Sequence, residues 1–507
     1  MGAGPYTSWG WLTSKPGGDL NGIIHGTKWT SPLITYSFTD SFFDYQAGYG
    51  THGFFVSQQT YYQFSAAQQS STRWILETGG AYSVAGLTGL GIAFAGYGAG
   101  NATLRYANTS SVDTARVGDF PGSYWNSGLS GKSDVYGYSM YQGDVWIGRQ
   151  NNQSGVPYAG TFHYATLMHE TGHALGLKHP HDYGFNDSFR DVLSVNYDYL
   201  EYTIMSYREH YRDEIDNYQN SHFPQTFMML DIAALQYLYG ADFSTNAGNT
   251  RYSWDAAGNS YLNGAVVPIT SPYGKIFQTI WDGNGNDTYD LRNFSAGMTV
   301  DLRPGQYSYF SSDTVAYLGG SQNQGYARGN VYNALQFYGD SRSLIENAWG
   351  GVGPDRLIGN TARNTLWGNN GNDQLYGLAG NDTLDGGGGQ DLLVGGDGDD
   401  LFKFRFLSDS TTTAPDTIND MSRVGTLGGD IIDLREIDAN LTLAGDQAFR
   451  PGSTGAGGMA TFNNGSYTEV RLYVDARAGH DATIWINDGA TITAASYSGR
   501  DGEDFYL

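Results

Sequence analysis

A run of glycine-rich nonapeptides at residues 350–403 constrains the fold more than any other feature of this sequence. Six consecutive copies share one register: GGVGPDRLI, GNTARNTLW, GNNGNDQLY, GLAGNDTLD, GGGGQDLLV and GGDGDDLFK. Glycine at the first and fourth positions permits left-handed turns and close approach of the backbone. The eighth position is apolar in every copy, at Leu357, Leu366, Leu375, Leu384, Leu393 and Phe402. This regularity predicts stacked short strands with that side chain pointing inward, and not a disordered glycine-rich linker.

The sixth position adds a repeated carboxylate, and the whole pattern resembles the calcium-binding repeat of RTX proteins. It is occupied by Asp355, Asp373, Asp382, Asp391 and Asp400. Because Ca²⁺ prefers carboxylate and carbonyl oxygens, several structural calcium ions are predicted. Two nonapeptides should form one turn of a parallel β-roll, with each ion bridging loops of successive turns. The second copy has Ala362 and Asn364 in place of glycine and aspartate, which predicts a weaker site there.

A weaker copy of the repeat, DGNGNDTYD, stands earlier in the chain at residues 282–290. It extends the predicted calcium-binding region on the N-terminal side of the main array. Further calcium ligands are predicted at Asp282, Asn284, Gly285, Asp287, Glu346, Gly351 and Gly353.

The composition excludes several classes of protein. The 507 residues include no cysteine, which rules out disulfides, thiolate metal sites and a cysteine nucleophile. A formal net charge of −24 argues against nucleic acid and anionic membranes as partners. No apolar run approaches the ~18 residues of a membrane span. The first residues, MGAGPYTSWGWLTSKPGG, have neither the basic n-region nor the apolar h-region of a classical export signal.

A second motif, MHETGHALGLKHP at residues 168–180, predicts a metal centre. His169 and His173 are four residues apart, so on a helix they share one face and can hold one ion. Gly176 can take the positive φ that ends the helix, and the returning chain then brings His179 to the same ion. Three neutral imidazoles leave a fourth position for water, the arrangement of a catalytic zinc site. Glu170 is placed to act as its general base.

The extended motif HExxHxxGxxH resembles that of the metzincins, and YTIMSY around Met205 is similar to their Met-turn. The segments HPHDYGF, DIAALQYLYG, WDGNGNDTYD and IENAWGG, together with the nonapeptides, are similar to serralysins specifically. The resemblance implies a secreted zinc endopeptidase that hydrolyses peptide bonds in protein and peptide substrates. It implies one catalytic zinc ion held by His169, His173, His179 and Tyr207. It also implies that Glu170 is the general base and that Tyr207 stabilises the oxyanion.

The remaining patterns predict two domains. Strands are expected at residues 34–38, 91–94, 103–106 and 143–147, and helices at 62–80, 164–177 and 228–239. Together with the resemblance, they predict an α+β metzincin catalytic domain over residues 1–245. Residues 246–507 are predicted to form an all-β, RTX-type parallel β-roll with a β-sandwich-like C-terminal part. An extended substrate is expected to pair with an edge strand within residues 115–121.

The last residues, GEDFYL, resemble the uncleaved C-terminal signal of type I secretion substrates. The expected protein is therefore an extracellular monomer whose partners are a type I exporter and its substrates, with a small proteinaceous inhibitor left open. Two other classes remain as alternatives: an RTX adhesin or surface protein with an inactive protease-like domain, and a polysaccharide lyase or epimerase with an RTX tail. The intact base Glu170 argues against the first, and the zinc motif argues against the second.

Overall fold

The computed structural model describes residues 9–11, 18–45, 57–111, 115–117, 121, 124–125, 137–138, 142–148, 157–182, 191–209, 222–319, 325–421, 429–463, 467–487 and 505–507. The chain divides into two compact units. The first comprises Met1–Ala247, Pro268–Gly283 and Val315–Ser343, and the second comprises Gly248–Val267, Asn284–Thr314 and Leu344–Leu507. The two predicted domains, with their boundary at residues 245/246, are each continuous in sequence. The two compact units instead alternate along the chain between residues 248 and 343. As a functional division, that boundary stays a prediction.

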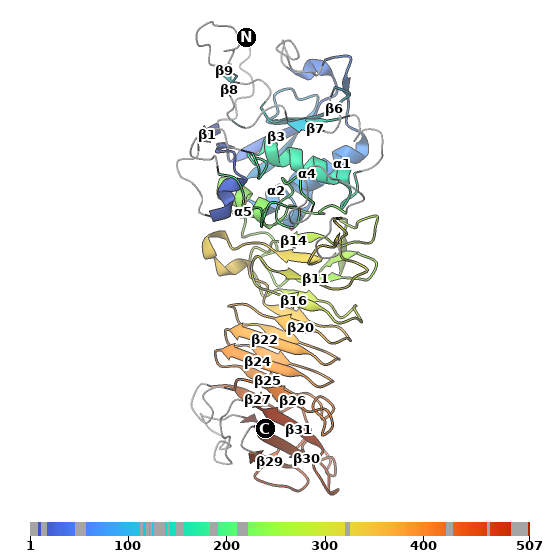
Figure 1. Ribbon diagram of the computed structural model, residues 1–507, viewed down its shortest axis with the longest axis vertical. Helices are drawn as coiled ribbons and strands as arrows, with labels where there is room; N and C mark the ends of the chain where they lie inside the picture. The colour runs from blue at the N-terminus through green and yellow to red at the C-terminus, as the bar shows by residue number, and fades with distance from the viewer. Residues whose placement is uncertain are drawn as a thin grey trace. The chain divides into compact units, whose positions relative to one another are not determined.

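The first unit contains a six-stranded sheet (Figure 1). Its strands are β3 (Leu33–Phe38), β4 (Tyr61–Tyr62), β5 (Gly91–Tyr97), β6 (Leu104–Thr109), β7 (Ala115–Val117) and β10 (Asp144–Ile147). They follow the order β5-β3-β6-β10-β7, with β4 beside β6. Strands β5, β3, β6 and β10 are parallel, whereas β7 runs antiparallel to β10 at one end of this order. The four predicted strands are confirmed, with ends that differ by one to three residues.

Four helices accompany this sheet among the residues that the structure describes. They are α1 (Ala66–Arg73), α2 (Val84–Leu87), α4 (Phe162–Ala174) and α5 (Met229–Tyr239). The helix predicted at residues 62–80 is shorter because Ser65 and Gln68 form a capping box that begins α1 at Ala66. After Arg73 the chain passes into a π-helical turn at Trp74–Thr78 and a 3₁₀ turn at Gly80–Tyr82. No helix in the part of the chain that the structure describes is long and apolar enough to cross a membrane.

Shorter elements complete the first unit. Its remaining strands are β1 (Trp9–Trp11), β2 (Thr27–Trp29), β8 (Tyr124–Trp125), β9 (Gly137–Tyr138), β14 (Gln278–Ile280) and β18 (Val331–Asn333). Strand β1 pairs with β2, β8 pairs with β9, and β14 pairs with β18. Short 3₁₀ turns lie at Gly18–Gly22, Phe42–Asp44, Phe337–Gly339 and Ser341–Ser343. Strands β14 and β18 come from the two late segments, so the C-terminal half of the sequence supplies part of this unit.

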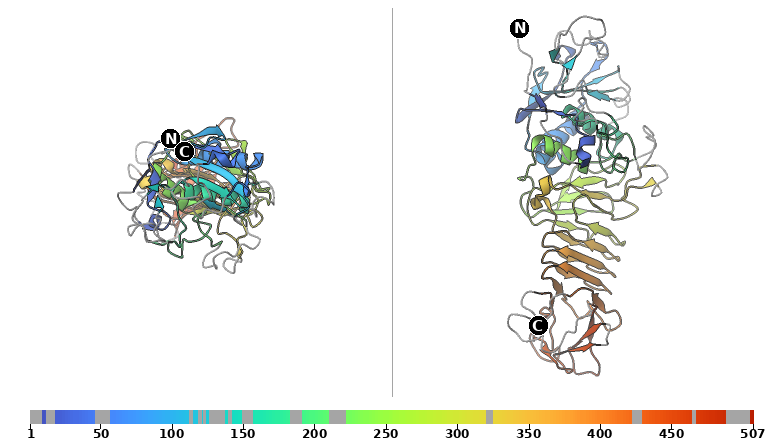
Figure 2. Two further views of the ribbon diagram at one scale, coloured as in Figure 1. Left: turned by 90° about the horizontal axis from the view of Figure 1, so that it is seen from above. Right: turned by 60° about the vertical axis from the view of Figure 1, so that its left-hand side comes forward.

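The second unit is built from two stacks of short strands (Figures 1 and 2). One sheet contains β11 (Arg251–Trp254), β12 (Ser260–Leu262), β13 (Ala265–Val267), β15 (Thr288–Asp290), β19 (Asn347–Trp349), β21 (Thr365–Trp367), β23 (Thr383–Asp385), β25 (Leu401–Lys403), β27 (Ile431–Asp433) and β32 (Phe505–Tyr506). The other contains β16 (Thr299–Asp301), β20 (Arg356–Ile358), β22 (Gln374–Ala379), β24 (Leu392–Asp397), β26 (Asp416–Ile418), β28 (Arg450–Pro451), β29 (Gly458–Asn463), β30 (Thr468–Tyr473) and β31 (Ala482–Ile486). A short strand, β17 (Tyr307–Ser308), also lies in this unit.

The register of these strands confirms the predicted winding of the roll. Leu357 in β20 pairs with Leu375 in β22, which pairs with Leu393 in β24, and both pairs of strands are parallel. The other sheet repeats this arrangement with Leu366 and Leu384. Partners are 18 residues apart, so two nonapeptides make one turn. The six side chains at the eighth position are fully buried between the sheets.

The C-terminal part of the second unit continues the same sheets. Strands β29, β30 and β31 are antiparallel neighbours, and β31 pairs in parallel with β26 of the roll. The final strand β32 pairs with β27, and Phe505 is buried. A sandwich-like arrangement of this part stays a prediction.

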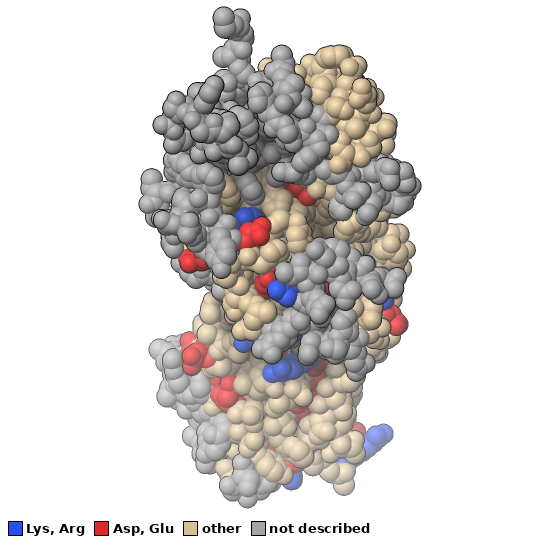
Figure 3. Space-filling view, turned by 45° about the horizontal axis from the view of Figure 1, so that its top comes forward, with Lys and Arg blue, Asp and Glu red and all other residues tan. Residues whose placement is uncertain are grey.

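The acidic excess of the chain is partly internal. Asp355, Asp373, Asp382, Asp391 and Asp400 are each at most 2% exposed. On the face drawn in Figure 3, the described acidic and basic side chains are scattered among uncharged ones. Five of the 51 acidic residues therefore lie in register with the repeat and inside the roll, where burial of an unpaired carboxylate is costly.

Candidate metal centre

Helix α4 carries the predicted zinc motif and is buried from Tyr164 to its last residue. It ends in a Schellman motif, because the Leu177 N–H donates to the Gly172 carbonyl and the Gly176 N–H donates to the His173 carbonyl. Gly176 has a φ of +105°, and a Cβ there would lie 2.5 Å from the Thr27 carbonyl oxygen. The predicted role of this glycine in ending the helix is confirmed.

The three predicted histidine ligands are held through their Nδ1 atoms. His169 Nδ1 lies 2.9 Å from the Ile204 carbonyl oxygen, and His173 Nδ1 lies 2.8 Å from the Leu177 carbonyl oxygen. His179 Nδ1 lies 2.6 Å from Asp182 Oδ2. A carbonyl or carboxylate oxygen can only accept, so each Nδ1 carries the proton and each Nε2 presents a lone pair.

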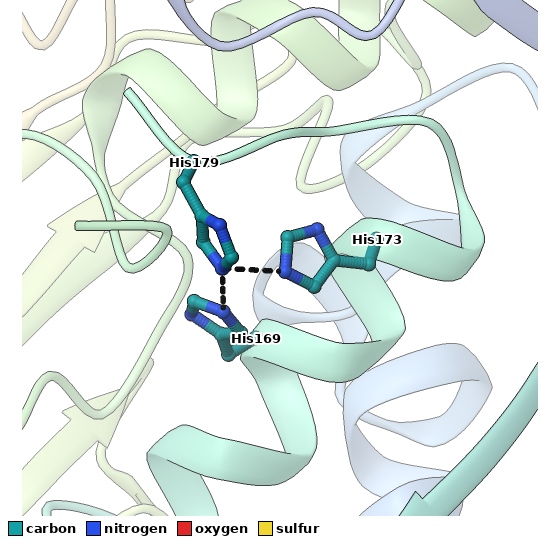
Figure 4. A group of neighbouring side chains, drawn as sticks. All are labelled: His169, His173 and His179. Atoms are coloured by element: carbon teal, nitrogen blue, oxygen red, sulfur yellow. Dashed lines mark hydrogen bonds between the residues drawn. The ribbon is translucent and has the colours of Figure 1, made fainter. Parts of the chain in front are cut away.

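These three Nε2 atoms converge (Figure 4). His179 Nε2 lies 3.1 Å from His169 Nε2 and 3.0 Å from His173 Nε2. Burial lowers the pKa of His169 to about 4 and that of His179 to about 2, and it lowers the pKa of His173 well below its ordinary value. Three neutral rings with their lone pairs facing one point form a donor set suited to zinc, and they fit the ion that the motif predicts.

The loop after α4 is fixed by a buried lysine. Lys178 is 2% exposed, and its Nζ donates to the carbonyl oxygens of Gly22 and Asp182 at 2.6 Å each. It also donates to the Asp191 carbonyl oxygen at 3.1 Å. These bonds hold the backbone on both sides of His179 and so set the direction in which its ring points.

The other predicted residues of the centre lie around the histidines. Glu170 is 7% exposed on α4, next to His169. The ring centroid of Tyr207 lies 4.3 Å from that of His179 and 5.5 Å from that of His169. Met205 is fully buried, and a Cβ on Gly172 would lie 2.8 Å from its Sδ, so a glycine there lets α4 rest against Met205. The structure thus brings together the three histidines and Tyr207, with Glu170 adjacent to His169 on α4.

Two neighbours of this centre were missed by the sequence reasoning. Asp182 orients His179, and His181 stacks on the His179 ring at 5.3 Å with an interplanar angle of 1°. His181 also lies 5.2 Å from the Tyr207 ring. The sequence signal for Asp182 is an acid three residues after the predicted metal ligand His179. Carboxylates that bind the second ring nitrogen commonly orient metal-binding histidines.

The predicted calcium ligands of the roll form a ladder. The backbone N–H of one sixth-position residue donates to the carboxylate of the residue one turn later, as from Asp355 to Asp373 and from Asp373 to Asp391, both at 2.7 Å. The parallel ladder runs from Asn364 to Asp382 at 2.7 Å and from Asp382 to Asp400 at 2.8 Å. In each of these four hydrogen bonds the acceptor is the Oδ1 atom of the carboxylate.

The second oxygen of each carboxylate, Oδ2, shows whether the ladder could hold cations. Among the described residues, the buried Oδ2 atoms of Asp373, Asp382, Asp391 and Asp400 have no hydrogen-bond partner. A Cβ on Gly377 would overlap both Asp382 Oδ2 and the Gly395 carbonyl oxygen, so oxygens from two successive turns face one small space. Buried, unpaired oxygens arranged in this way are a donor set for Ca²⁺.

The electrostatics of the ladder agree with this chemistry. Burial raises the pKa of Asp373 to about 8 and the pKa values of Asp391 and Asp400 to about 7. Burial also raises the pKa values of Asp355 and Asp382 to about 6. Neighbouring carboxylates contribute to the raised pKa values of Asp373, Asp391 and Asp400, so a bound divalent cation would relieve both burial and repulsion.

The ladder continues beyond the repeats in a way that the sequence reasoning missed. The Asp391 N–H donates to Asp416 Oδ1, and the Asp400 N–H donates to Asp430 Oδ1, across 25 and 30 residues. Asp416 Oδ2 has no partner among the described residues, and burial raises the pKa of Asp416. No regular sequence spacing predicts Asp416 and Asp430, because each follows a loop of a different length.

The remaining predicted calcium ligands lie at or before the first nonapeptide of the main array. The Asp287 N–H donates to Glu346 Oε2 at 2.7 Å, and the Gly351 N–H donates to Asp355 Oδ2 at 2.6 Å. The Gly353 carbonyl oxygen lies next to Gly371, one turn later. Asp282 is buried in the first unit, whereas Asn284 and Gly285 begin the second unit's segment Asn284–Thr314.

The fold and the site define a class of protein, a β-roll chain with a three-histidine metal centre, and comparisons with known proteins give the family. Residues 241–495 match the family model described as Peptidase M10 serralysin C terminal. Metalloprotease AprA of Pseudomonas entomophila (strain L48) is 37% identical over 350 residues, which cover 66% of this chain and 64% of the relative. Serralysin of Proteus mirabilis is 39% identical over 343 residues, covering 66% and 62%. Serralysin G of Dickeya chrysanthemi is 31% identical over 485 residues, covering 94% and 83%.

The chain spans slightly less than two thirds of the length of the first two of these relatives. The chain belongs to the serralysin family of peptidase family M10. The resemblance noted in the sequence is thereby confirmed.

Proposed function

We propose that this protein is a zinc endopeptidase that hydrolyses peptide bonds in proteins. The observation that carries the proposal is the convergence of the His169, His173 and His179 Nε2 atoms beside Glu170. The names of the relatives, metalloprotease and serralysin, support the same activity. An adhesin with an inactive protease-like domain is not favoured, because the base and all three histidines are present together.

Zinc held by the three histidines would supply a Lewis acid that makes a nearby water acidic and polarises the substrate carbonyl. Glu170 accepts the proton of the attacking water and then donates it to the leaving amine nitrogen. The Tyr207 hydroxyl donates a hydrogen bond to the oxyanion as the carbonyl carbon becomes tetrahedral. The hydrogen bonds to each Nδ1 keep the three rings in the tautomer that leaves Nε2 available.

The substrate chain would bind in extended form along β7. This strand lies at one end of the described sheet and next to α4, so its outer edge can pair with a peptide backbone. Residues 118–120 of the predicted substrate strand lie outside the described part of the chain.

The same proposal includes structural calcium in the roll and export to the extracellular space. Calcium would be bound by the unpartnered Oδ2 atoms of the ladder together with carbonyl oxygens of neighbouring turns. Scarce calcium inside a cell would leave the roll unfolded for passage through a type I exporter, and abundant calcium outside would fold it. A proteinaceous inhibitor and a monomeric state belong to the proposal as well.

The direct test is Glu170→Ala in the calcium-loaded protein. We expect zinc at one equivalent and unchanged folding, with a loss of roughly 10²–10⁴ in kcat on a peptide substrate. Glu77→Gln is the control, because Glu77 is an acid of the same unit that accepts from the Tyr36 hydroxyl at 2.8 Å and is outside the zinc motif. More than half of wild-type turnover in Glu170→Ala would overturn the assignment of the base.

A further inference from the structure

We propose that Asp231 is a positioning residue for the metal centre, which holds the Met-turn in the shape that orients His169. The inference rests on the proposed zinc function and assigns to that site a residue outside the motif. Asp231 lies in the first turn of α5, 62 residues after His169 in the sequence, and is fully buried.

The carboxylate of Asp231 accepts three hydrogen bonds. Its Oδ1 accepts from the Thr203 hydroxyl at 2.5 Å. Its Oδ2 accepts from the Ile204 N–H at 2.8 Å and from the Met228 N–H at 2.9 Å. The Met228 bond caps α5, and the other two fix the backbone of residues 203–204 against the start of that helix.

The bonds continue to the zinc ligand. The Met205 N–H donates to Thr203 Oγ1 at 3.1 Å, while the carbonyl of the same peptide group, that of Ile204, accepts from His169 Nδ1 at 2.9 Å. One peptide group therefore has its N–H tied to Asp231 through Thr203 and its oxygen tied to His169. The preceding peptide group is tied to Asp231 directly through the Ile204 N–H.

A carboxylate is required for this arrangement. Asp231 must accept on both oxygens, from an O–H and from two N–H groups, and an amide offers only one accepting oxygen. In Asp231→Asn the new NH₂ group would face at least one of these donors and leave it unpaired. The turn would then shift, and the carbonyl that keeps the proton on His169 Nδ1 would no longer be fixed. Changes in the groups that orient metal ligands typically weaken metal affinity 10–100-fold.

The test compares zinc affinity in three variants of the full-length, calcium-loaded protein. Asp231→Asn removes the double acceptor. Thr203→Val removes the hydroxyl that links Asp231 to the Met205 N–H and adds no charge change. Asp144→Asn is the matched control, because Asp144 is a fully buried aspartate of the same unit whose two oxygens accept from Arg105 at 2.6 and 2.9 Å.

The zinc dissociation constant is measured by competition with a chromophoric chelator, and the d–d spectrum of the cobalt-substituted protein reports the ligand geometry. We expect a 10–100-fold weaker zinc affinity in Asp231→Asn, about tenfold in Thr203→Val, and a change within about twofold in Asp144→Asn. The cobalt spectrum should change in the first two variants only. Excess zinc should restore part of the lost kcat.

The outcomes separate this inference from the proposed function. If wild type and His169→Ala bind zinc alike, the proposed zinc centre is wrong. If His169→Ala loses zinc but Asp231→Asn and Thr203→Val bind it within twofold of wild type with unchanged cobalt spectra, the role of Asp231 is wrong. Should Asp231→Asn fail to fold, Thr203→Val carries the same decision.

Discussion

The histidine centre and the β-roll are both candidate metal regions, but they are built in opposite ways. In the centre, each histidine already has a hydrogen-bond acceptor at Nδ1, and burial keeps all three rings neutral. In the roll, buried carboxylates have one oxygen without a partner among the described residues, and their pKa values are raised. From this difference we expect that the first region can keep its shape without an ion, whereas the second depends on bound cations for its stability.

The largest expected effect is therefore that of calcium removal. One nonapeptide buries one apolar side chain, which cannot offset the ordering of nine residues at ~1–2 kcal/mol each. In a calcium-selective chelator, amides of residues 350–403 should lose protection from hydrogen exchange, and the loss should reverse cooperatively at submillimolar to millimolar Ca²⁺. Removal of zinc alone should leave both the roll and α4 protected.

Magnesium is the control for this comparison. Because Mg²⁺ requires octahedral coordination and retains bound water, it should not restore protection of the roll. A roll that stays fully protected in excess chelator would show that the carboxylates are stable without ions, and the contrast between the regions would be lost.

The next largest effect is a change in catalytic rate with no change in folding. Tyr207→Phe should lower kcat by about 10² with little change in KM, since its hydroxyl is expected to act only on the developing oxyanion. Zinc content and thermal unfolding should match wild type. Tyr202→Phe is the control, because Tyr202 lies five residues before Tyr207 and its hydroxyl accepts from Arg328 at 3.0 Å. Identical kinetics for Tyr207→Phe and wild type would reduce Tyr207 to a packing residue.

Much of this contrast could be predicted from the sequence, because both regions have signals of fixed local spacing. The zinc motif spans 11 residues around one helix and its cap, so the ligands His169, His173 and His179 follow from helix geometry and Gly176. The nonapeptide likewise contains its turn, its ligand and its core residue within one period.

The remaining features depend on contacts that only the folded chain creates. Asp231 reaches the centre from another helix, and the Ile204 carbonyl has no sequence signature at all. Asp416 and Asp430 extend the ladder after loops of unequal length. The compact units are also discontinuous in sequence, because segments 268–283 and 315–343 belong to the first unit, and no local spacing in the sequence reveals such an exchange.

A smaller effect is expected from pH on the calcium-free roll. Burial raises the pKa of Asp373 to about 8 and that of Asp391 to about 7 in the folded state, against about 4 in an unfolded chain. The folded state then binds more protons than the unfolded state, so stability falls as pH rises from about 4 to about 8. In the calcium-free protein, the residual β circular dichroism of the roll should be larger at pH 5 than at pH 8. Saturating calcium should abolish or invert that order, because calcium binds the deprotonated carboxylates; an unchanged order in calcium would contradict this account.

The smallest effects distinguish two positions within the roll itself, Asp382 and Asn364, which are successive rungs of one ladder. Asp382 Oδ2 lacks a partner among the described residues, whereas the Asn364 side chain is already satisfied. Its Oδ1 accepts from the Asn360 N–H at 2.7 Å, and its Nδ2 donates to the Glu346 carbonyl oxygen at 2.9 Å. An amide that donates to a carbonyl replaces the attraction that an ion would provide.

Asp382→Ala should therefore bind one calcium ion fewer and raise the calcium midpoint of folding about tenfold or more, whereas Asn364→Ala should raise it about twofold without changing the number of ions. Asn364→Asp sharpens the comparison, because it places a second oxygen opposite the Glu346 carbonyl and should add one calcium ion. Ion stoichiometry by metal analysis and the midpoint by circular dichroism give both quantities. If Asn364→Asp gained no ion and Asp382→Ala lost none, the unpartnered oxygens would not be the calcium ligands, since these two changes alter that one feature in opposite directions.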